Sequence, residues 1–217
     1  MQKKVLITGG SGLLAINWAL SIRDNYSVVL ILHNRKISIQ GVDTEVALLD
    51  SIGGCRAIIE KYQPDLVIHT AGLTSVESCE QRPQIARKVN VDLAKNIAVT
   101  CDKLNVKLVY ISTDHLFSGE HSMMREESQV EPLNNYAKTK YQGELKVQEN
   151  CKDVLIVRTN FFGWGTKYRQ SFSDFILNRL RSNKSVDLFQ DVFFTPILID
   201  ELVRRVNQLI DLDASGV

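Results

Sequence analysis

The chain has 217 residues, of which 44% are hydrophobic and 24% are charged, and its formal net charge is +1. This is the composition of an ordinary folded domain with one sizeable core. The near-neutral charge gives no indication of binding to nucleic acid or to a membrane surface. No apolar run reaches the roughly 18 residues that a membrane-spanning helix needs.

The cysteines and the first residues favour a cytoplasmic protein. Cys55, Cys79, Cys101 and Cys151 are scattered and form neither a CxxC motif nor a Cys/His cluster. Single thiols are typical of a reducing compartment. The opening "MQKKVLITGG" leads into a buried strand that is too short for a signal sequence. We therefore expect no structural metal, and no nucleic acid or membrane among the partners.

Short β-branched runs alternate with helix-length segments along most of the chain. The runs predict strands at residues 4–9, 27–33, 45–50, 65–71, 106–113 and 153–159. The segments between them predict helices at residues 12–24, 52–62, 83–101 and 136–150. Continuous apolar strands interleaved with helices are typical of a parallel sheet covered on both faces. The pattern therefore predicts an α/β fold with a doubly wound parallel sheet.

The alternation of predicted strands and helices ends after Arg158. The stretch "NFFGWGTKYRQ" predicts an aromatic, glycine-rich loop, and two helices are expected at residues 172–181 and 200–211. We therefore predict a first domain over residues 1–159 and a small C-terminal annex over residues 160–217.

The stretch "ITGGSGLLA" follows the first strand and opens the first helix. Gly9 permits a tight turn, and Gly12 lets a pyrophosphate approach the amides at the positive end of the helix. Ala15 stands where a third glycine often falls, and alanine is accepted there. Glycine spacing alone is a weak signal, but the strand–turn–helix context favours dinucleotide binding over a plain tight turn.

The end of the second strand indicates which dinucleotide is bound. An Asp or Glu at this place usually binds a free ribose 2′-hydroxyl, but no acid lies between Asp24 and Asp43. Asn34, Arg35 and Lys36 stand there instead, and a guanidinium offers a fork of hydrogen bonds to a phosphate. The pattern favours NADP over NAD, with a solvated basic loop as the plain alternative.

Two further features fit more than one role. Asp50 ends the predicted third strand, where it would accept a hydrogen bond from an adenine amino group, and it would also serve as the cap of the helix at Ile52. Phe161, Phe162 and Trp164 fit equally well a wall on which a ligand stacks or the core of the annex.

Tyr136 and Lys140 are four residues apart in "PLNNYAKTKYQGE", so they share one face of the predicted helix. A tyrosine has an ordinary pKa of about 10, and a nearby ammonium and an oxidised nicotinamide ring would lower it. The tuned hydroxyl would then give a proton to a carbonyl oxygen as hydride reaches the carbon. Ser112 and Thr113 end the fifth strand, where a hydroxyl would polarise that carbonyl. A chance pair on a charged helix is the plain alternative.

Together these motifs resemble the extended short-chain dehydrogenase/reductase family. "TGGSGLLA" is similar to its TGxxGxxG element, with Ala15 in the last place, and "PLNNYAKTK" is similar to its PxxxYxxxK element. "VIHTAG" and "VNVDLAKNIA" also resemble family segments, with Asn90 as the usual asparagine. "ISTDHLFSG", "AGLTSVESCE" and "RTNFFGWG" resemble one branch, the dTDP-4-dehydrorhamnose reductases. The resemblance covers nearly the whole chain.

The resemblance implies a Rossmann domain over residues 1–159 and a partial substrate-binding region over residues 160–217, because family members usually continue beyond "LDASGV". The implied catalytic set is Thr113, Tyr136 and Lys140. The implied substrate site is Asn160, Phe161 and Phe162. The implied cofactor shell is Thr8, Gly9, Ser11, Gly12, Leu13, Leu14, Asn34, Arg35, Asp50, Ser51, Ala71, Gly72 and Thr74, together with Tyr136 and Lys140.

The reaction that the resemblance implies is the NADPH-dependent reduction of a 4-keto-6-deoxy sugar nucleotide, with NAD as the less favoured cofactor. Dehydratases of the family carry Thr-Asp-Glu where this chain has Thr113-Asp114-His115, so dehydration is disfavoured. Two alternatives stay open, a sugar-nucleotide epimerase and a non-catalytic NADP-binding regulatory subunit, a role that the branch includes in a methionine adenosyltransferase complex. The expected partner is a small sugar nucleotide, and a homodimer is left open.

Overall fold

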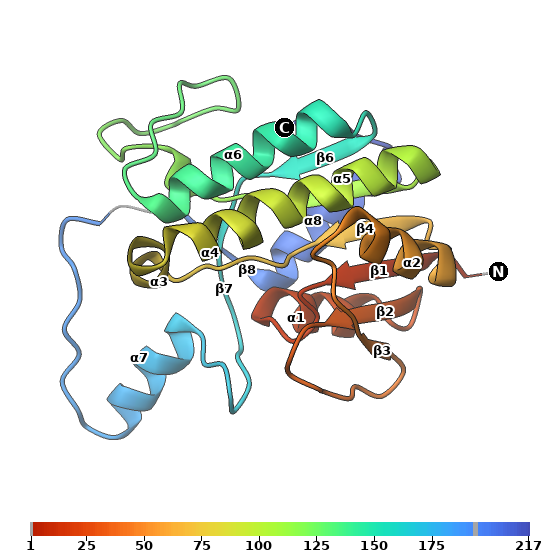
Figure 1. Ribbon diagram of the computed structural model, residues 1–217. Helices are drawn as coiled ribbons and strands as arrows, with labels where there is room; N and C mark the ends of the chain where they lie inside the picture. Colours follow the sequence, from red (N-terminus) through yellow and green to blue (C-terminus); the bar gives the residue numbers. More distant parts are fainter. Residues whose placement is uncertain (1, 193–194) are drawn as a thin grey trace.

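The computed structural model describes residues 2–192 and 195–217, and its centre is one parallel sheet of six strands (Figure 1). The strands lie in the order β3-β2-β1-β4-β5-β6. They are β1 Lys4–Thr8, β2 Ser27–Leu32, β3 Asp43–Val46, β4 Leu66–His69, β5 Lys107–Ile111 and β6 Val154–Val157. The winding reverses between β1 and β4, so a crevice opens at the carboxyl ends of these two strands. The predicted α/β fold with a doubly wound parallel sheet is confirmed.

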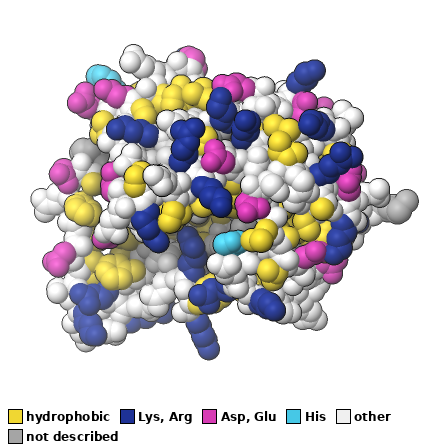
Figure 2. All heavy atoms as spheres, in the orientation of Figure 1, with side chains coloured by type: hydrophobic (Ala, Val, Ile, Leu, Met, Phe, Trp, Pro, Cys, Tyr) yellow, Lys and Arg dark blue, Asp and Glu magenta, His cyan; other side chains and the backbone are white. Residues whose placement is uncertain are grey.

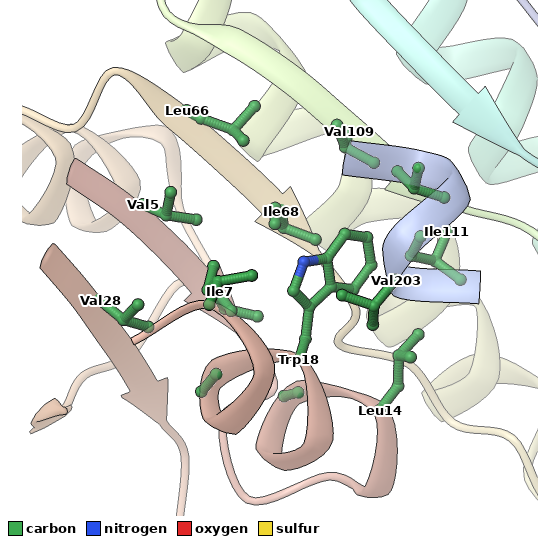
Figure 3. Close-up of a cluster of buried hydrophobic side chains, with 14 of the residues drawn as sticks. Val5, Ile7, Leu14, Trp18, Val28, Leu66, Ile68, Val109, Ile111 and Val203 are labelled. Carbon is green, nitrogen blue, oxygen red and sulfur yellow. The ribbon is translucent and has the colours of Figure 1, made fainter. Parts of the chain in front are cut away.

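Helices cover both faces of this sheet. The helices of one face are α1 Leu13–Ile22 and α8 Ile199–Asp211. The helices of the other face are α2 Ile52–Tyr62, α5 Leu93–Leu104 and α6 Asn135–Asn150. In Figure 3 the fully buried Trp18 lies among Leu14, Ile68 and Val203, so it joins α1, α8 and the sheet. Burial on both faces explains why the strands read as continuous apolar runs.

The third strand begins and ends earlier than predicted. The sequence favoured residues 45–50, whereas β3 pairs with β2 only over Asp43–Val46. Ala47, Leu48 and Leu49 follow the strand and line the cavity described below. Ala47 and Leu49 also pack against the core between the sheet, α2 and α5, so their hydrophobic pattern reflects burial beyond the end of the strand.

The long helix predicted before the fifth strand is present, but it contains a π-helical turn and follows a short helix that was not predicted. A short helix α3 (Val76–Gln81) precedes α4 (Pro83–Arg87), which is followed by a π-helical turn (Lys88–Asp92) and then by α5. In the π-helical turn, the Asn90 side chain bonds the backbone N and O of Leu73 at 2.8 and 3.1 Å. Such a turn inserts a residue into a helix. Hydrophobic periodicity does not reveal the insertion, so the sequence predicted one continuous helix.

The C-terminal part of the chain divides between the core and the surface. A second, two-stranded parallel sheet pairs β7 (Asn160–Phe162) with β8 (Pro196–Leu198), where the sequence predicted only a loop at its first strand. The helix α7 (Phe172–Arg181) buries none of its side chains and stands apart from the main sheet in Figure 1. By contrast, α8 packs into the core beside α1. The division of domains after residue 159 stays a prediction.

The four cysteines are free thiols, and all are buried. Burial raises the pKa of Cys55 to about 12 and that of Cys151 to about 11, because the thiolate would lose its hydration. Across residues 2–192 and 195–217, no helix is long and apolar enough to cross a membrane. In the same ranges, no three His, Cys, Asp or Glu side chains are grouped so that they would hold a metal ion.

Candidate active site

A cavity of about 900 Å³ lies at the carboxyl ends of the strands. It is lined by residues that follow β1, β2, β4 and β5, by the first turns of α6, and by the segment before α7. Figure 2 shows this face hollowed between α7 and α1, with cationic side chains around the hollow. The cavity is therefore where open α/β sheets bind their ligands, at the point where the strand order reverses.

The glycine turn after β1 has the shape of a phosphate cradle. Gly9 has a φ of 68°, and a Cβ there would lie 2.8 Å from the Ala71 Cα. A Cβ on Gly12, directly before α1, would lie 2.9 Å from the carbonyl oxygen of Gly9. Residues 11–14 line the cavity at the N-terminus of this helix. The two glycines therefore let the turn close on itself and against the segment after β4, and a turn of this kind before a helix fits a pyrophosphate bound by helix amides.

Most of the predicted cofactor shell lines the cavity: Gly9, Ser11, Gly12, Leu13, Leu14, Asp50, Ala71, Gly72, Thr74, Tyr136 and Lys140. Thr8 instead lies buried below the turn, with its Oγ1 2.8 Å from His69 Nδ1. Ser51 caps α2 by accepting a hydrogen bond from Gly54 N at 3.1 Å. The alternative role of Asp50 as the cap of α2 is therefore wrong, and Asp50 faces the cavity.

Asn34 and Arg35 lie just outside the cavity lining, beyond the end of β2, and both are exposed. The Arg35 guanidinium carbon lies 4.3 Å from the centre of the Tyr168 ring. Tyr168 belongs to the segment between β7 and α7, which the sequence did not connect with the cofactor.

The three predicted catalytic residues converge on the cavity. Tyr136 and Lys140 face it from α6, and Thr113 faces it from the end of β5. The helix begins where the Asn134 side chain accepts a hydrogen bond from the backbone of α6. Thr113 Oγ1 accepts a hydrogen bond from His115 N at 3.2 Å and caps a short 3₁₀ helix. This backbone contact uses only the oxygen of the Thr113 hydroxyl and leaves its proton to a side-chain or ligand acceptor on the cavity side.

Lys140 is a fixed cation below the cavity, with only 6% of its surface exposed. Its Nζ donates to the Ile111 carbonyl oxygen at 2.6 Å and lies 4.3 Å from the centre of the Tyr110 ring. Burial lowers the pKa of Lys140 to about 7, although the nearby carboxylate of Glu144 acts in the opposite direction. The Tyr110 ring in turn stacks on His69, with 5.8 Å between the centroids. The position of the ammonium is thus set by buried neighbours on two strands.

Tyr136 has a raised pKa and not the lowered one that the sequence predicted. Burial is the largest cause, and a hydrogen bond with the Thr113 side chain opposes it. The Lys140 ammonium donates to the Ile111 carbonyl oxygen and is not directed at the phenol, which explains why it does not lower the pKa of Tyr136. The His115 ring stands edge-on to Tyr136, with 5.7 Å between the centroids. Tyr136 is therefore a protonated phenol at neutral pH, which is the form that a proton donor needs.

A buried ionic cluster beside the cavity was not predicted. Glu144 is 1% exposed, and Arg158 donates to its carboxylate from Nη2 at 2.6 Å and from Nε at 3.2 Å. Ser112 Oγ donates to the same carboxylate at 2.7 Å. Glu144 follows Lys140 by four residues, so its place on the inner face of α6 was a readable signal. Arg158 carried no such signal, because its partner is distant in the sequence.

Gly143 lets α6 approach the π-helical turn closely. A Cβ on Gly143 would overlap with the carbonyl oxygen of Asn90 and would lie 2.7 Å from the Tyr110 hydroxyl. Asn90 Nδ2 donates to Thr139 Oγ1 on the same helix at 3.0 Å. This contact sets the position of the helix that carries the candidate catalytic pair.

The predicted substrate residues divide at the edge of the cavity. Asn160 and Phe161 line it, whereas Phe162 does not and is 38% exposed. Trp164 is 63% exposed, so the aromatic residues form neither one continuous wall nor the core of an annex. Polar residues that line the cavity without having been predicted include His33, Lys88, Arg169, Gln170 and Ser171.

The sheet order, the glycine turn and the Tyr–Lys helix together define the class of protein. It is an α/β protein of the extended short-chain dehydrogenase/reductase type, with the sheet order and glycine turn of the dinucleotide-binding fold. Residues 3–216 match the family model described as the RmlD substrate binding domain, and the chain belongs to this family. The predicted resemblance to the extended family and to its dTDP-4-dehydrorhamnose reductase branch is confirmed.

Three relatives show how far the similarity extends. The probable low-salt glycan biosynthesis reductase Agl14 of Haloferax volcanii is 28% identical over 97% of this chain and 71% of its own length. Methionine adenosyltransferase 2 subunit beta of Pongo abelii is 30% identical over 86% of this chain and 56% of its own length. The crystal structure of dTDP-4-dehydrorhamnose reductase from Bacillus anthracis in complex with NADP has a TM-score of 0.86 at 25% identity, covering 100% of this chain and 73% of that one.

Proposed function

We propose that this chain is an NADPH-dependent reductase of a 4-keto-6-deoxy sugar nucleotide. The observation that carries the proposal is the convergence of Thr113, Tyr136 and Lys140 on a cavity whose other end is the glycine turn. Two relatives support the substrate class, because one is named a glycan biosynthesis reductase and the other a dTDP-4-dehydrorhamnose reductase.

NADPH, when bound, supplies the hydride. Tyr136 gives its hydroxyl proton to the carbonyl oxygen of the sugar, and its raised pKa keeps that proton in place at neutral pH. Thr113 donates a hydrogen bond to the same oxygen, because its hydroxyl proton is not used by the backbone. Lys140, which lines the same cavity, would hold the nicotinamide ribose. Asn160 and Phe161 contact the sugar at the open side of the cavity.

The residues around the cavity fit NADP. Gly9 and Gly12 allow the tight turn before α1, and the amides at the start of this helix would bind the pyrophosphate. Asp50 faces the cavity, where it accepts a hydrogen bond from the adenine. Asn34 and Arg35 bind the 2′-phosphate, because no acid between Asp24 and Asp43 would bind a free 2′-hydroxyl in its place.

The test is the loss of nicotinamide absorbance when the protein, NADPH and a panel of 4-keto sugar nucleotides are mixed. We expect turnover on at least one sugar. Tyr136→Phe, which lacks only the hydroxyl, should lower kcat by about 10²- to 10⁴-fold, because it removes the proton donor. NADPH fluorescence in the same samples should report unchanged binding. NADPH binding by the wild type without turnover on any sugar would refute the reductase.

A regulatory subunit is the second candidate, favoured by the 30% identity to methionine adenosyltransferase 2 subunit beta. An intact Tyr–Lys pair does not exclude this role, because a fold and its site can persist without turnover. NADPH binding, no turnover, and co-elution with a methionine adenosyltransferase catalytic subunit would favour it.

An epimerase would instead retain NAD(H) through purification, and the basic residues after β2 speak against that alternative.

A further inference from the structure

A tight hairpin between β7 and α7 reaches towards the N-terminal glycine turn. Thr166 and Arg169 pair through two backbone hydrogen bonds of 2.9 and 3.1 Å, which we call the 166–169 hairpin. The pairing leaves Lys167 and Tyr168 at the tip. The position of the Tyr168 ring is therefore set by a defined turn and not by a long open loop.

The base of the 166–169 hairpin is held by the first turn of α7. Asp174 Oδ2 accepts hydrogen bonds from Gly165 N at 2.7 Å and from Ser171 N at 2.8 Å. A Cβ on Gly165 would overlap with both Asp174 Oδ2 and the Arg169 carbonyl oxygen, so the approach requires a glycine. Asp174 also forms a capping box with Ser171, which ties the hairpin to a stable helix start.

The 166–169 hairpin contacts both sides of the point where the strand order reverses. Tyr168 Oη donates to the Ser11 carbonyl oxygen in the glycine turn at 3.3 Å. Arg169 Nη2 donates to Thr74 Oγ1 after β4 at 3.3 Å. Ser11, Thr74 and Arg169 all line the cavity. The hairpin is thus part of the wall around the candidate cofactor site.

The face of the Tyr168 ring holds Arg35. The guanidinium carbon lies 4.3 Å from the ring centre, well within the distance at which a cation and an aromatic face attract each other. Within residues 2–192 and 195–217, Arg35 forms no ion pair with a carboxylate. The contact is made by the charge of the guanidinium, so the N–H donors that point away from the ring remain available for phosphate oxygens. The ring therefore orients the cation without using the donors that a phosphate would need.

We propose that Tyr168 is a specificity-determining positioning residue that holds Arg35 for the 2′-phosphate of NADPH. The inference rests on the NADPH use proposed above and names a residue from the C-terminal part of the chain as the source of that preference. One edge of Tyr168 is tied to the glycine turn and one face carries Arg35, so the ring fixes the cation relative to the pyrophosphate cradle. Without the ring, Arg35 is a flexible surface side chain that must be ordered upon binding.

The experiment is a fluorescence titration of NADPH and NADH against the full chain and its variants. Tyr168→Ala should raise the Kd for NADPH by up to about 30-fold, because binding must then order an arginine side chain that the ring no longer holds. The Kd for NADH, which lacks the phosphate, should change by less than about twofold. Tyr168→Phe keeps the ring face and loses only the hydroxyl bond to Ser11, so its Kd for NADPH should lie between those of the wild type and the Ala variant.

A double-mutant cycle shows whether Tyr168 acts on NADPH affinity through Arg35 or through a general disturbance of the fold. In Arg35→Ala, which lacks the cation, the added Tyr168→Ala change should have almost no further effect on NADPH binding. Additive losses would overturn the proposal, and so would an equal loss of NADPH and NADH affinity in Tyr168→Ala or a Phe variant that behaves like the Ala variant. A wild type that binds both cofactors equally would also overturn it. These readouts need no turnover, so failure of the reductase activity is seen separately.

Discussion

The helices α6 and α7 both border the cavity, but they are held in opposite ways. α6 buries Ala137, Thr139, Lys140, Gly143, Glu144 and Val147. α7 buries no residue, and its Phe172, Phe175 and Leu180 side chains are 55%, 41% and 60% exposed. The candidate proton-transfer groups therefore belong to the core, whereas the neighbouring wall is attached mainly through the first turn of α7. Substitutions of buried residues on α6 should therefore lower the free energy of unfolding much more than substitutions on α7.

Glu144→Ala should have the largest effect on stability. It leaves the guanidinium of Arg158, whose side chain is 12% exposed, without its carboxylate partner. Removing one member of a buried ion pair typically costs about 3–5 kcal/mol of unfolding free energy. Urea denaturation monitored by circular dichroism would measure the loss.

Glu149→Ala on the same helix is the matched control for Glu144→Ala. Glu149 pairs with Lys146 at 2.6 Å, but both side chains are about half exposed. An exposed pair of this kind is worth roughly 0.5 kcal/mol. Equal losses in the two variants would show that burial of the Glu144–Arg158 pair does not govern the stability of α6.

Lys140→Met should show a pH-dependent effect of a few kcal/mol. The folded pKa of Lys140 is about 7, below its ordinary value of 10.5, because the ammonium is buried. The burial cost is therefore complete below pH 7 and disappears as the pH rises from about 7 to 10.5. The variant should gain most relative to the wild type at pH 6 and progressively less towards pH 10, by roughly 1.4 kcal/mol for each unit of pKa shift.

Urea denaturation at pH 6, 8 and 10 would measure this trend. Lys138→Met, an exposed lysine on the same helix, is the matched control and should show no such trend. A constant difference between Lys140→Met and the wild type across the three pH values would mean that the ammonium is hydrated in solution.

Local patterns predicted the sheet and one wall of the site, because their signals lie within a few residues. The glycine turn and the Tyr–Lys spacing are of this kind, and the structure brings Gly9, Tyr136 and Lys140 to one cavity. Asn90 and Arg158 were different, because each is defined by partners far away in the sequence. The partners lie 17 and 14 residues away on other elements, beyond the three- and four-residue spacings that a helix pattern reports.

The sign of the Tyr136 pKa shift shows a second limit of sequence reasoning. The spacing of four residues predicted a neighbouring ammonium that would lower the pKa. The spacing was correct, but Lys140 is directed at the Ile111 carbonyl, and burial of the phenol dominates. Burial of the phenol depends on α3 and on the segment after β5, which pack against the start of α6 and cannot be predicted from the sequence of α6 alone.

Phe175→Ala should have the smallest effect. The side chain is 41% exposed on a helix without buried residues, so its removal should cost less than about 0.5 kcal/mol of unfolding free energy. Val147→Ala on α6 is the matched comparison, because Val147 is fully buried and its loss should cost roughly 2 kcal/mol through lost burial and an added cavity. Urea denaturation at two protein concentrations would measure both. If Phe175→Ala costs as much as Val147→Ala, and the cost grows with protein concentration, then a second copy of the chain covers the apolar face of α7 in solution. The exposure of α7 would then hold only for the isolated chain, because in the dimer both α6 and α7 would be buried.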